Sequence, residues 1–151
     1  MLILLDIDGV MVPAKGWKNP EILDDGFPAF SNTVVSALQN LISKDVTIVL
    51  TTSHKSNYRI EEWKNIFKQR NLNIENLKTL PENLTNISRK DEILNWLAIN
   101  NSDKDFMIID DDKSLNDLPA FLKKRLIQPS PYIGLTDEHL HIAKDIMTKK
   151  L

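Results

Sequence analysis

The chain has 151 residues and a formal net charge of -2, with 42% hydrophobic and 26% charged residues. These values are typical of a single globular domain spanning residues 1–151, and the charge gives no general attraction to nucleic acids or anionic membranes. The absence of cysteine excludes disulfides and thiolate metal sites, and three scattered histidines argue against zinc. The N-terminus lacks the basic start of a secretory signal, and no apolar stretch is long enough to span a membrane, so we expect a cytoplasmic protein.

The first predicted element is a strand over Leu2–Leu5. Its four apolar residues show no polar alternation, which is typical of a strand buried on both faces in the middle of a parallel sheet. Asp6, Asp8 and Gly9 follow it, and two buried carboxylates at a strand end need a compensating cation or donor set. Residues 11–30 have prolines, glycines and no sustained period, which predicts a loop that acts as a small flap.

The rest of the chain alternates between helical and strand patterns. Strands are predicted over residues 46–50, 77–80 and 106–109, with an edge strand over 125–128. Helices are predicted over residues 31–44, 56–71 and 88–99, over 115–124 with a break near Pro119, and from Thr136 onward. This alternation predicts an α/β fold with an open, largely parallel sheet, helices on both faces and ligands beyond the carboxyl ends of the strands.

Polar residues follow several of these strands. Because the carboxyl ends of parallel strands share one edge of a sheet, these side chains can converge although they are far apart in sequence. Carboxylates in contact repel by roughly 1–4 kcal/mol per pair at 4 Å, and a hard cation such as Mg²⁺ relieves that repulsion. The residues that would meet are Asp6, Asp8, Thr51 or Thr52, Asp110 and Asp111, with Lys90 opening the helix before the fourth strand.

These residues resemble the four motifs of the haloacid dehalogenase-like (HAD) superfamily, in the family's order. The motifs are Asp6-Ile7-Asp8-Gly9-Val10, a hydroxyl residue ending Ile48-Val49-Leu50-Thr51-Thr52, Lys90, and Ile108-Ile109-Asp110-Asp111. The chain is most similar to small HAD domains of nucleic-acid repair proteins, partly through the Thr-Thr pair and Gly134-Leu135-Thr136. The resemblance implies a three-layer, Rossmann-like fold, with a five-stranded parallel sheet in the order 3-2-1-4-5 and no large cap domain.

The resemblance also implies an activity, that of a Mg²⁺-dependent phosphatase working through an aspartyl-phosphate. Asp6 would be the nucleophile, and Asp8 the general acid and then the general base. Lys90 and a threonine hydroxyl would hold the transferred phosphoryl group in line. The implied ligands of Mg²⁺ are Asp6, the backbone carbonyl of Asp8, and Asp110, with Asp111 as a further ligand or a neighbour of one.

The second motif leaves two alternatives open. Thr51 ends the apolar run directly, whereas Thr52 with Ser53 better matches phosphatases that carry a hydroxyl pair, and we favour Thr52 as the catalytic hydroxyl. Thr51, Ser53 and Lys55 are then candidates for substrate binding. His54 and Lys55 could contact substrate, but we favour an exposed polar loop for both. Trp17 could stack on a base, but we favour a role in pinning the loop to the core.

Two other classes of function also fit parts of this pattern. A phospho-accepting receiver domain gathers Asp, Thr and Lys around magnesium on an α/β sheet, but its acceptor Asp follows a middle strand, whereas here the Asp-x-Asp pair comes first. A scaffold protein that kept the fold and lost the activity is disfavoured by the intact motifs. Activity toward a generic aryl phosphate with Mg²⁺ would separate the three.

The spacing of the motifs bears on the substrate. About 40 residues separate Asp8 from Thr51 and about 37 separate Thr52 from Lys90, which leaves room only for elements that the core itself needs. We therefore expect an open site suited to a phosphate on a macromolecule, such as a nucleic-acid end. The alternative is a small phosphate ester closed in by the flap or a neighbouring subunit. Candidate contacts around the entrance are Lys15, Lys18, Lys55 and Arg59.

Overall fold

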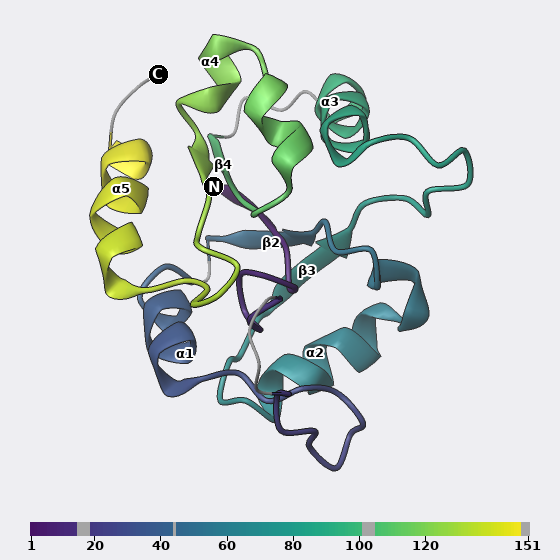
Figure 1. Ribbon diagram of the computed structural model, residues 1–151, viewed down its shortest axis with the longest axis vertical. Helices are drawn as coiled ribbons and strands as arrows, with labels where there is room; N and C mark the ends of the chain where they lie inside the picture. Colours follow the sequence, from purple (N-terminus) through teal and green to yellow (C-terminus); the bar gives the residue numbers. More distant parts are fainter. Residues whose placement is uncertain (15–18, 44, 101–104, 149–151) are drawn as a thin grey trace.

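A parallel five-stranded sheet in the order β3-β2-β1-β4-β5 lies at the centre of the protein (Figure 1). The computed structural model describes residues 1–14, 19–43, 45–100 and 105–148. The strands are β1 (Leu2–Leu5), β2 (Thr47–Leu50), β3 (Asn76–Thr79), β4 (Phe106–Ile109) and β5 (Leu126–Ile127). The predicted fold class and strand order are therefore confirmed.

The register of the three middle strands aligns their carboxyl ends. Leu5 of β1 pairs with Leu50 of β2 on one side and with Ile109 of β4 on the other. All four residues of β1 are buried, as the uninterrupted apolar run predicts. The residues that follow these strands therefore leave the sheet at one level, and this level is where the polar motifs lie.

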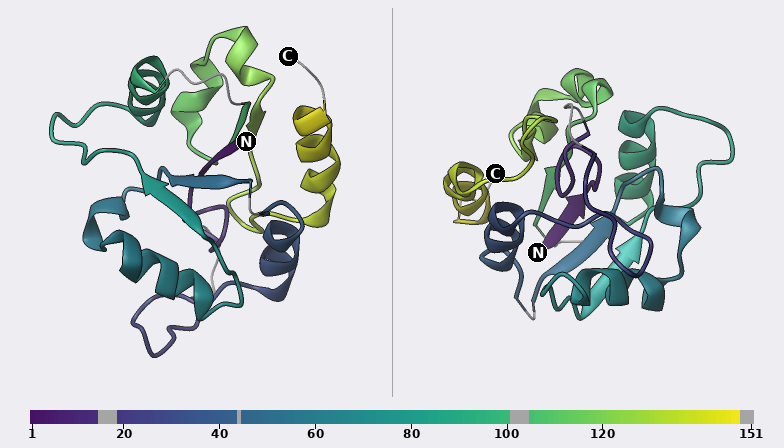
Figure 2. Two further views of the ribbon diagram at one scale, coloured as in Figure 1. Left: turned by 180° about the vertical axis from the view of Figure 1, so that it is seen from behind. Right: turned by 60° about the horizontal axis from the view of Figure 1, so that its bottom comes forward.

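Helices cover both faces of the sheet (Figure 2). Ser31 caps α1 and Ser88 caps α3, each hydroxyl accepting a hydrogen bond from a backbone N–H three residues on. The 3₁₀ turn η2 ends at Asp117 and Pro119 is the N-cap of α4, which confirms the predicted break. The helical elements are α1 (Asn32–Gln39), η1 (Lys55–Asn57), α2 (Ile60–Lys68), α3 (Arg89–Ile99), η2 (Lys113–Asp117), α4 (Ala120–Lys123) and α5 (Asp137–Thr148).

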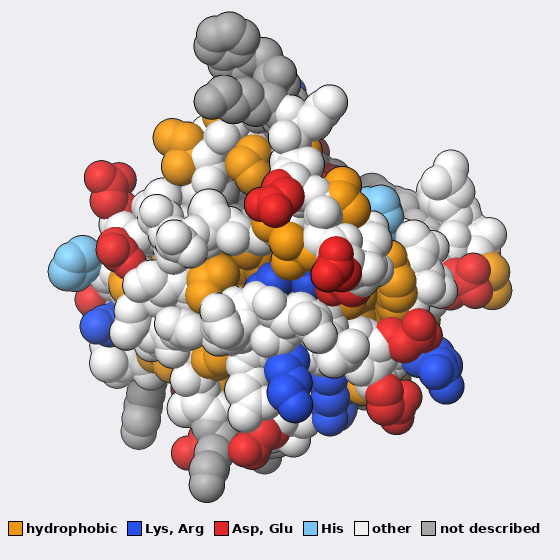
Figure 3. Space-filling view, turned by 90° about the horizontal axis from the view of Figure 1, so that it is seen from below, with side chains coloured by type: hydrophobic (Ala, Val, Ile, Leu, Met, Phe, Trp, Pro, Cys, Tyr) orange, Lys and Arg blue, Asp and Glu red, His pale blue; other side chains and the backbone are white. Residues whose placement is uncertain are grey.

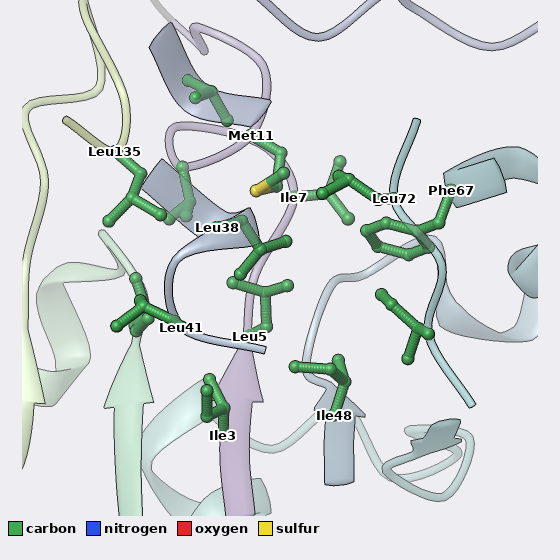
Figure 4. Packing of buried hydrophobic residues seen from close by; sticks show 14 of the residues in the cluster. Ile3, Leu5, Ile7, Met11, Leu38, Leu41, Ile48, Phe67, Leu72 and Leu135 are labelled. Carbon is green, nitrogen blue, oxygen red and sulfur yellow. The ribbon is translucent and has the colours of Figure 1, made fainter. Parts of the chain in front are cut away.

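Alternating side chains of the strands pack into two hydrophobic cores, one on each face of the sheet. Ile3 and Leu5 pack with residues of α1, α2 and α5, as Figure 4 shows for part of that core, whereas Leu2 and Leu4 pack with residues of α3, η2 and α4. Each face of the sheet thus has its own layer of helices. In the described part of the chain no helix is long and apolar enough to cross a membrane.

The predicted flap is anchored to the body near its two ends, and much of its described part, 11–14 and 19–30, is exposed, including residues 19–22. Met11, Phe27 and Phe30 are buried, and Ile22 forms a bridge with Pro28. The segments between β1 and β2 and between β2 and α3 contain the loops, helices and strand of the core and no cap domain in the described ranges. Lys15, Trp17 and Lys18 lie outside the described residues.

Candidate active site

Three carboxylates meet beyond the ends of β1 and β4. Asp6, Asp110 and Asp111 each offer an oxygen atom, and these three atoms lie within 4.8 Å of one another. Asp6 and Asp110 are buried, and Asp111 is partly exposed. The aligned register explains this meeting, because Asp6 and Asp110 directly follow the paired residues Leu5 and Ile109. The predicted convergence of the first and fourth motifs is present.

Gly9 allows this close approach of the two loops. Its φ of +85° lies in the left-handed region, which strains any residue with a side chain. A Cβ atom at this position would also overlap the carboxylate of Asp111. The glycine after the Asp-x-Asp pair therefore provides both the turn and the space that Asp111 occupies beside Asp6.

Arg89 supplies the cation that contacts the acidic cluster. Its Nη1 lies 2.6 Å from Oδ2 of Asp110 and 3.5 Å from Oδ1 of Asp6, and its side chain is only 10% exposed. The same nitrogen lies 3.4 Å from the Thr51 hydroxyl oxygen. Arg89 is the first residue of α3, so the N-terminus of that helix delivers the guanidinium to the ends of the strands.

Lys90, the residue expected from the sequence, has a different environment. Its backbone N–H donates a hydrogen bond to the Ser114 hydroxyl at 3.1 Å, and its side chain is half-buried. In the part of the chain that the structure describes, no ion pair joins its ammonium group to Asp6, Asp110 or Asp111. Sequence reasoning missed Arg89, although the serine cap already placed both residues in the first turn of one helix.

The two threonines of the second motif are both buried but have different partners. The Thr51 hydroxyl donates to Oδ2 of Asp110 at 2.9 Å, which joins it to the acidic cluster. The Thr52 hydroxyl oxygen accepts a hydrogen bond from the backbone N–H of His54 at 3.3 Å, and Ser53 is exposed. The preference for Thr52 as the catalytic hydroxyl stays a prediction, while Thr51 contacts the cluster in this structure.

Asp8 and His54 lie together at the solvent-exposed side of the cluster. Nε2 of His54 is 2.9 Å from Oδ2 of Asp8, and their side chains are 44% and 48% exposed. The Asp8 carboxylate therefore remains accessible to solvent and to a substrate, whereas Asp6 is almost fully covered. This difference matches a nucleophile held inside the site and a proton carrier at its entrance.

Comparison with known proteins agrees with this arrangement. Residues 2–140 match the family described as the HAD domain in Swiss Army Knife RNA repair proteins. The chain belongs to this family. No curated protein matches the chain. Family membership makes the protein a HAD-type hydrolase related to nucleic-acid repair proteins and indicates an activity of the phosphatase type.

The electrostatics of this HAD domain reflect the crowding of its buried carboxylates. Burial, followed by the charge of Asp110, raises the pKa of Asp6 to about 9, and the nearby Arg89 only partly offsets this. Burial also raises the pKa of Asp111. Burial alone would lower the pKa of Arg89, but the charges of Asp110 and Asp6 outweigh it, so that pKa is raised and the guanidinium stays charged.

An oxygen-only donor set of this kind fits Mg²⁺. Three carboxylates crowd around one point, while a single guanidinium contacts two of them, so negative charge remains in excess. A hard dication held by oxygen ligands would compensate that excess. Asp6, Asp110 and Asp111 are the side chains of this HAD domain that would hold the ion, together with the backbone carbonyl of Asp8.

Lys55 is buried in a second ion pair behind the cluster. Its Nζ lies 2.8 Å from Oε2 of Glu92, and the two side chains are 4% and 10% exposed. Glu92 in turn lies 3.8 Å from Nε of Arg89. The predicted contact of Lys55 with substrate therefore stays a prediction that requires this pair to open.

On the face seen in Figure 3, basic and acidic side chains are intermixed around a central hollow rather than gathered into one basic patch.

Proposed function

We propose that this HAD domain is a Mg²⁺-dependent phosphatase that hydrolyses a phosphate monoester at the end of an RNA or related nucleic acid. The observation that carries the proposal is the meeting of Asp6, Asp110 and Asp111 within contact of Arg89. The negatively charged oxygens of a phosphoryl group in transfer need several cationic and hydrogen-bonding partners at once. Catalysis of this reaction therefore depends mostly on positioning and on charge stabilisation. Mg²⁺ would supply further charge neutralisation at the phosphoryl oxygens.

In the first chemical step, a carboxylate oxygen of Asp6 attacks phosphorus. The bond from Asp6 oxygen to phosphorus forms as the bond from phosphorus to the leaving oxygen breaks, and Asp8 gives that oxygen its proton. Arg89, which lies beside Asp6 and Asp110, stabilises the spreading negative charge. The products of this step are a free hydroxyl end and an aspartyl-phosphate on Asp6.

In the second step, water releases the phosphate. Asp8, now ionised, accepts a proton from the attacking water as the new bond from oxygen to phosphorus forms. The bond between Asp6 and phosphorus breaks, which returns the Asp6 carboxylate. The half-exposed position of Asp8 supports this role, because both the leaving group and the water must approach from solvent.

The nucleic-acid end as substrate is supported by the family and by the open site. The family's own description names RNA repair proteins, and the described residues carry no cap domain that would enclose a small metabolite. On the face seen in Figure 3, basic and acidic side chains of the described residues are intermixed, which argues for recognition of an end rather than of a long duplex.

The test is hydrolysis of matched phosphate esters by the full chain with Mg²⁺. We expect end-phosphorylated oligonucleotides to be hydrolysed with a higher kcat/KM than nucleoside monophosphates, and activity to disappear with excess chelator. A clear preference for the monomer would instead identify a small phosphate ester as substrate. A stable phosphorylated protein without turnover would indicate a receiver-like domain, and the absence of both would indicate a binding protein.

A further inference from the structure

A groove of about 630 Å³ lies beside the candidate active site, over the carboxyl ends of β2 and β3. It is bounded by η1 and the start of α2, by the segment that joins β3 to α3, and by one face of α3. That joining segment extends away from the body on the right of Figure 1. Most of the groove surface is apolar, and its apolar residues include Tyr58, Leu80, Pro81, Ile87, Trp96 and Ile99.

A single layer of charged side chains separates this groove from the acidic cluster. Lys55 and Glu92 line the groove and form an ion pair of 2.8 Å, and Glu92 lies 3.8 Å from Arg89, which contacts Asp6. The exposed edges of the groove and of the candidate active site are also close to each other. His54 contacts Asp8, and Ser56, two residues later, lines the groove, so their Cα atoms are at most about 7.6 Å apart.

We propose that this groove binds the base and sugar of the terminal nucleotide whose phosphate is held at Asp6. The proposal rests on the proposed phosphatase function and adds a specificity site to it. A nucleoside attached to a phosphate at Asp6 would extend past the entrance formed by Asp8 and His54, and Ser56, two residues after His54, lines the groove.

The chemistry of the walls fits a nucleoside. Trp96 and Tyr58 provide aromatic surface and Pro81 an apolar one, on which a base ring can pack. Asn95, on the exposed side of α3, offers an amide that both donates and accepts, as the edge of a base requires. Arg59, at the rim and 80% exposed, can reach the phosphate of the next nucleotide.

The dimensions favour a nucleoside over a protein partner. A cavity of this volume is in the range of sites for single small ligands, whereas a stable protein interface buries about 800 Å² on each partner. The groove also lies only one layer of side chains from the acidic cluster, and a docking surface for a separate protein would not need to lie so close.

The experiment fills the groove and compares substrates with and without the terminal base. Asn95→Trp places an indole in the groove from an exposed position of α3. Ala98→Trp, at an exposed position of the same helix that does not line the groove, is the matched control. The substrates are end-phosphorylated RNA trinucleotides, phosphorylated at either end, and their counterparts that lack only the base of the phosphorylated nucleotide.

We expect the wild-type protein to prefer the base-bearing trinucleotide by at least tenfold in kcat/KM. Asn95→Trp should abolish that preference, and Ala98→Trp should retain it. Equal kcat/KM for both substrates in the wild type, or an unchanged preference in Asn95→Trp, would overturn the proposal. Self-association or protein binding that is lost in Asn95→Trp without any change in hydrolysis would overturn it in favour of a protein interface.

Failure of the phosphatase function itself gives a different result. In that case the wild type hydrolyses neither trinucleotide, and calorimetric titration with the unphosphorylated trinucleotide tests the groove directly. Binding that is lost in Asn95→Trp and kept in Ala98→Trp would support the groove as a nucleoside site. No binding to the wild type would overturn it.

Discussion

Nη1 of Arg89 lies 2.6 Å from Oδ2 of Asp110 and 3.5 Å from Oδ1 of Asp6, so one guanidinium joins the carboxylates that follow two neighbouring strands. The sequence motif pointed instead to Lys90, the next residue along α3. The two residues lie in one helical turn, but successive residues of an α-helix point in directions about 100° apart. In this structure Arg89 is the one that contacts the cluster.

The first prediction separates the roles of Arg89 and Lys90. Arg89→Met should lower kcat/KM by about 10²–10³, because a preorganised donor to the transferring phosphoryl group is lost. Lys90→Met, which also replaces a cationic side chain by methionine at the next position, should lower kcat/KM far less. Both variants are assayed on one end-phosphorylated oligonucleotide, with circular dichroism to confirm folding. A larger loss in Lys90→Met would restore Lys90 to the role that the resemblance gives it.

β1 and β4 were predictable because both are short, uninterrupted apolar runs, whereas β3 (Asn76–Thr79) is of mixed polarity. Leu2–Leu5 and Phe106–Ile109 have the buried pattern of a parallel sheet, and the predicted bounds of the third strand differ from β3 by one residue. The order of the strands came from the family resemblance, because local sequence does not encode which strands are neighbours.

The directions in which individual side chains point were less predictable from the sequence. Lys55 reads as an exposed loop residue, yet it is buried against Glu92, which lies 37 positions away in sequence. The rotation of α3 about its axis is set by how Ile93 and Trp96 pack in the core, and this decides that Arg89 faces the cluster. Such pairings depend on tertiary packing, so no local sequence pattern predicts them.

The second prediction concerns the charge of Asp6. Asp6→Asn should abolish turnover, because an amide is no nucleophile, and Asp8→Asn should cripple it by removing the proton carrier. Asp6→Asn should still fold, as its thermal unfolding would show. Substantial hydrolysis by purified Asp6→Asn would exclude the aspartyl-phosphate mechanism.

The third prediction is the pH dependence of metal-free stability. The pKa of Asp6 is raised from 3.8 to about 9 by burial and by Asp110, so between these values the folded protein binds a proton that the unfolded chain has released. Stability in chelator should therefore fall as the pH rises from about 5 to 8, and should fall less in Asp6→Asn. Chemical denaturation at several pH values measures this. Parallel pH profiles of the two proteins would contradict it.

The fourth prediction tests the metal ligands through stability rather than activity. Mg²⁺ at about 100 times its dissociation constant should stabilise the wild-type fold by about 2.7 kcal/mol, seen as a rise in Tm. Asp111→Asn should need more Mg²⁺ for the same rise, because one ligand of the cluster is lost. Asp91→Asn, which removes an exposed carboxylate of α3 outside the cluster, is the control. Equal Mg²⁺ dependence in all three proteins would exclude Asp111 as a ligand.

The fifth prediction concerns Arg70, which fixes the loop 19–30 to the end of α2. Its guanidinium is 2% exposed, donates to both carboxylate oxygens of Asp25 and to the backbone carbonyls of Phe27 and Pro28, and stacks over the Phe27 and Phe30 rings. Arg70→Met should lower the free energy of unfolding by about 3–5 kcal/mol, because it leaves these acceptors without their partner.

The hydrogen bonds from Arg70 also lower the pKa of Asp25, so this carboxylate stabilises the fold above its ordinary pKa of 3.8 and loses that effect as the pH falls through its lower folded value. Arg70→Met should therefore flatten the acid limb of the stability profile, as urea titrations between about pH 2 and 5 would show. Arg59→Met is the control, because the Arg59 side chain is 80% exposed and forms a surface ion pair with Glu62. If both variants unfolded at the same urea concentration as the wild type, Arg70 would not anchor the loop. A second outcome is that Arg70→Met is less stable and also has a lower kcat after correction for the folded fraction. The loop 19–30 would then take part in the reaction, as the flap that its sequence predicts.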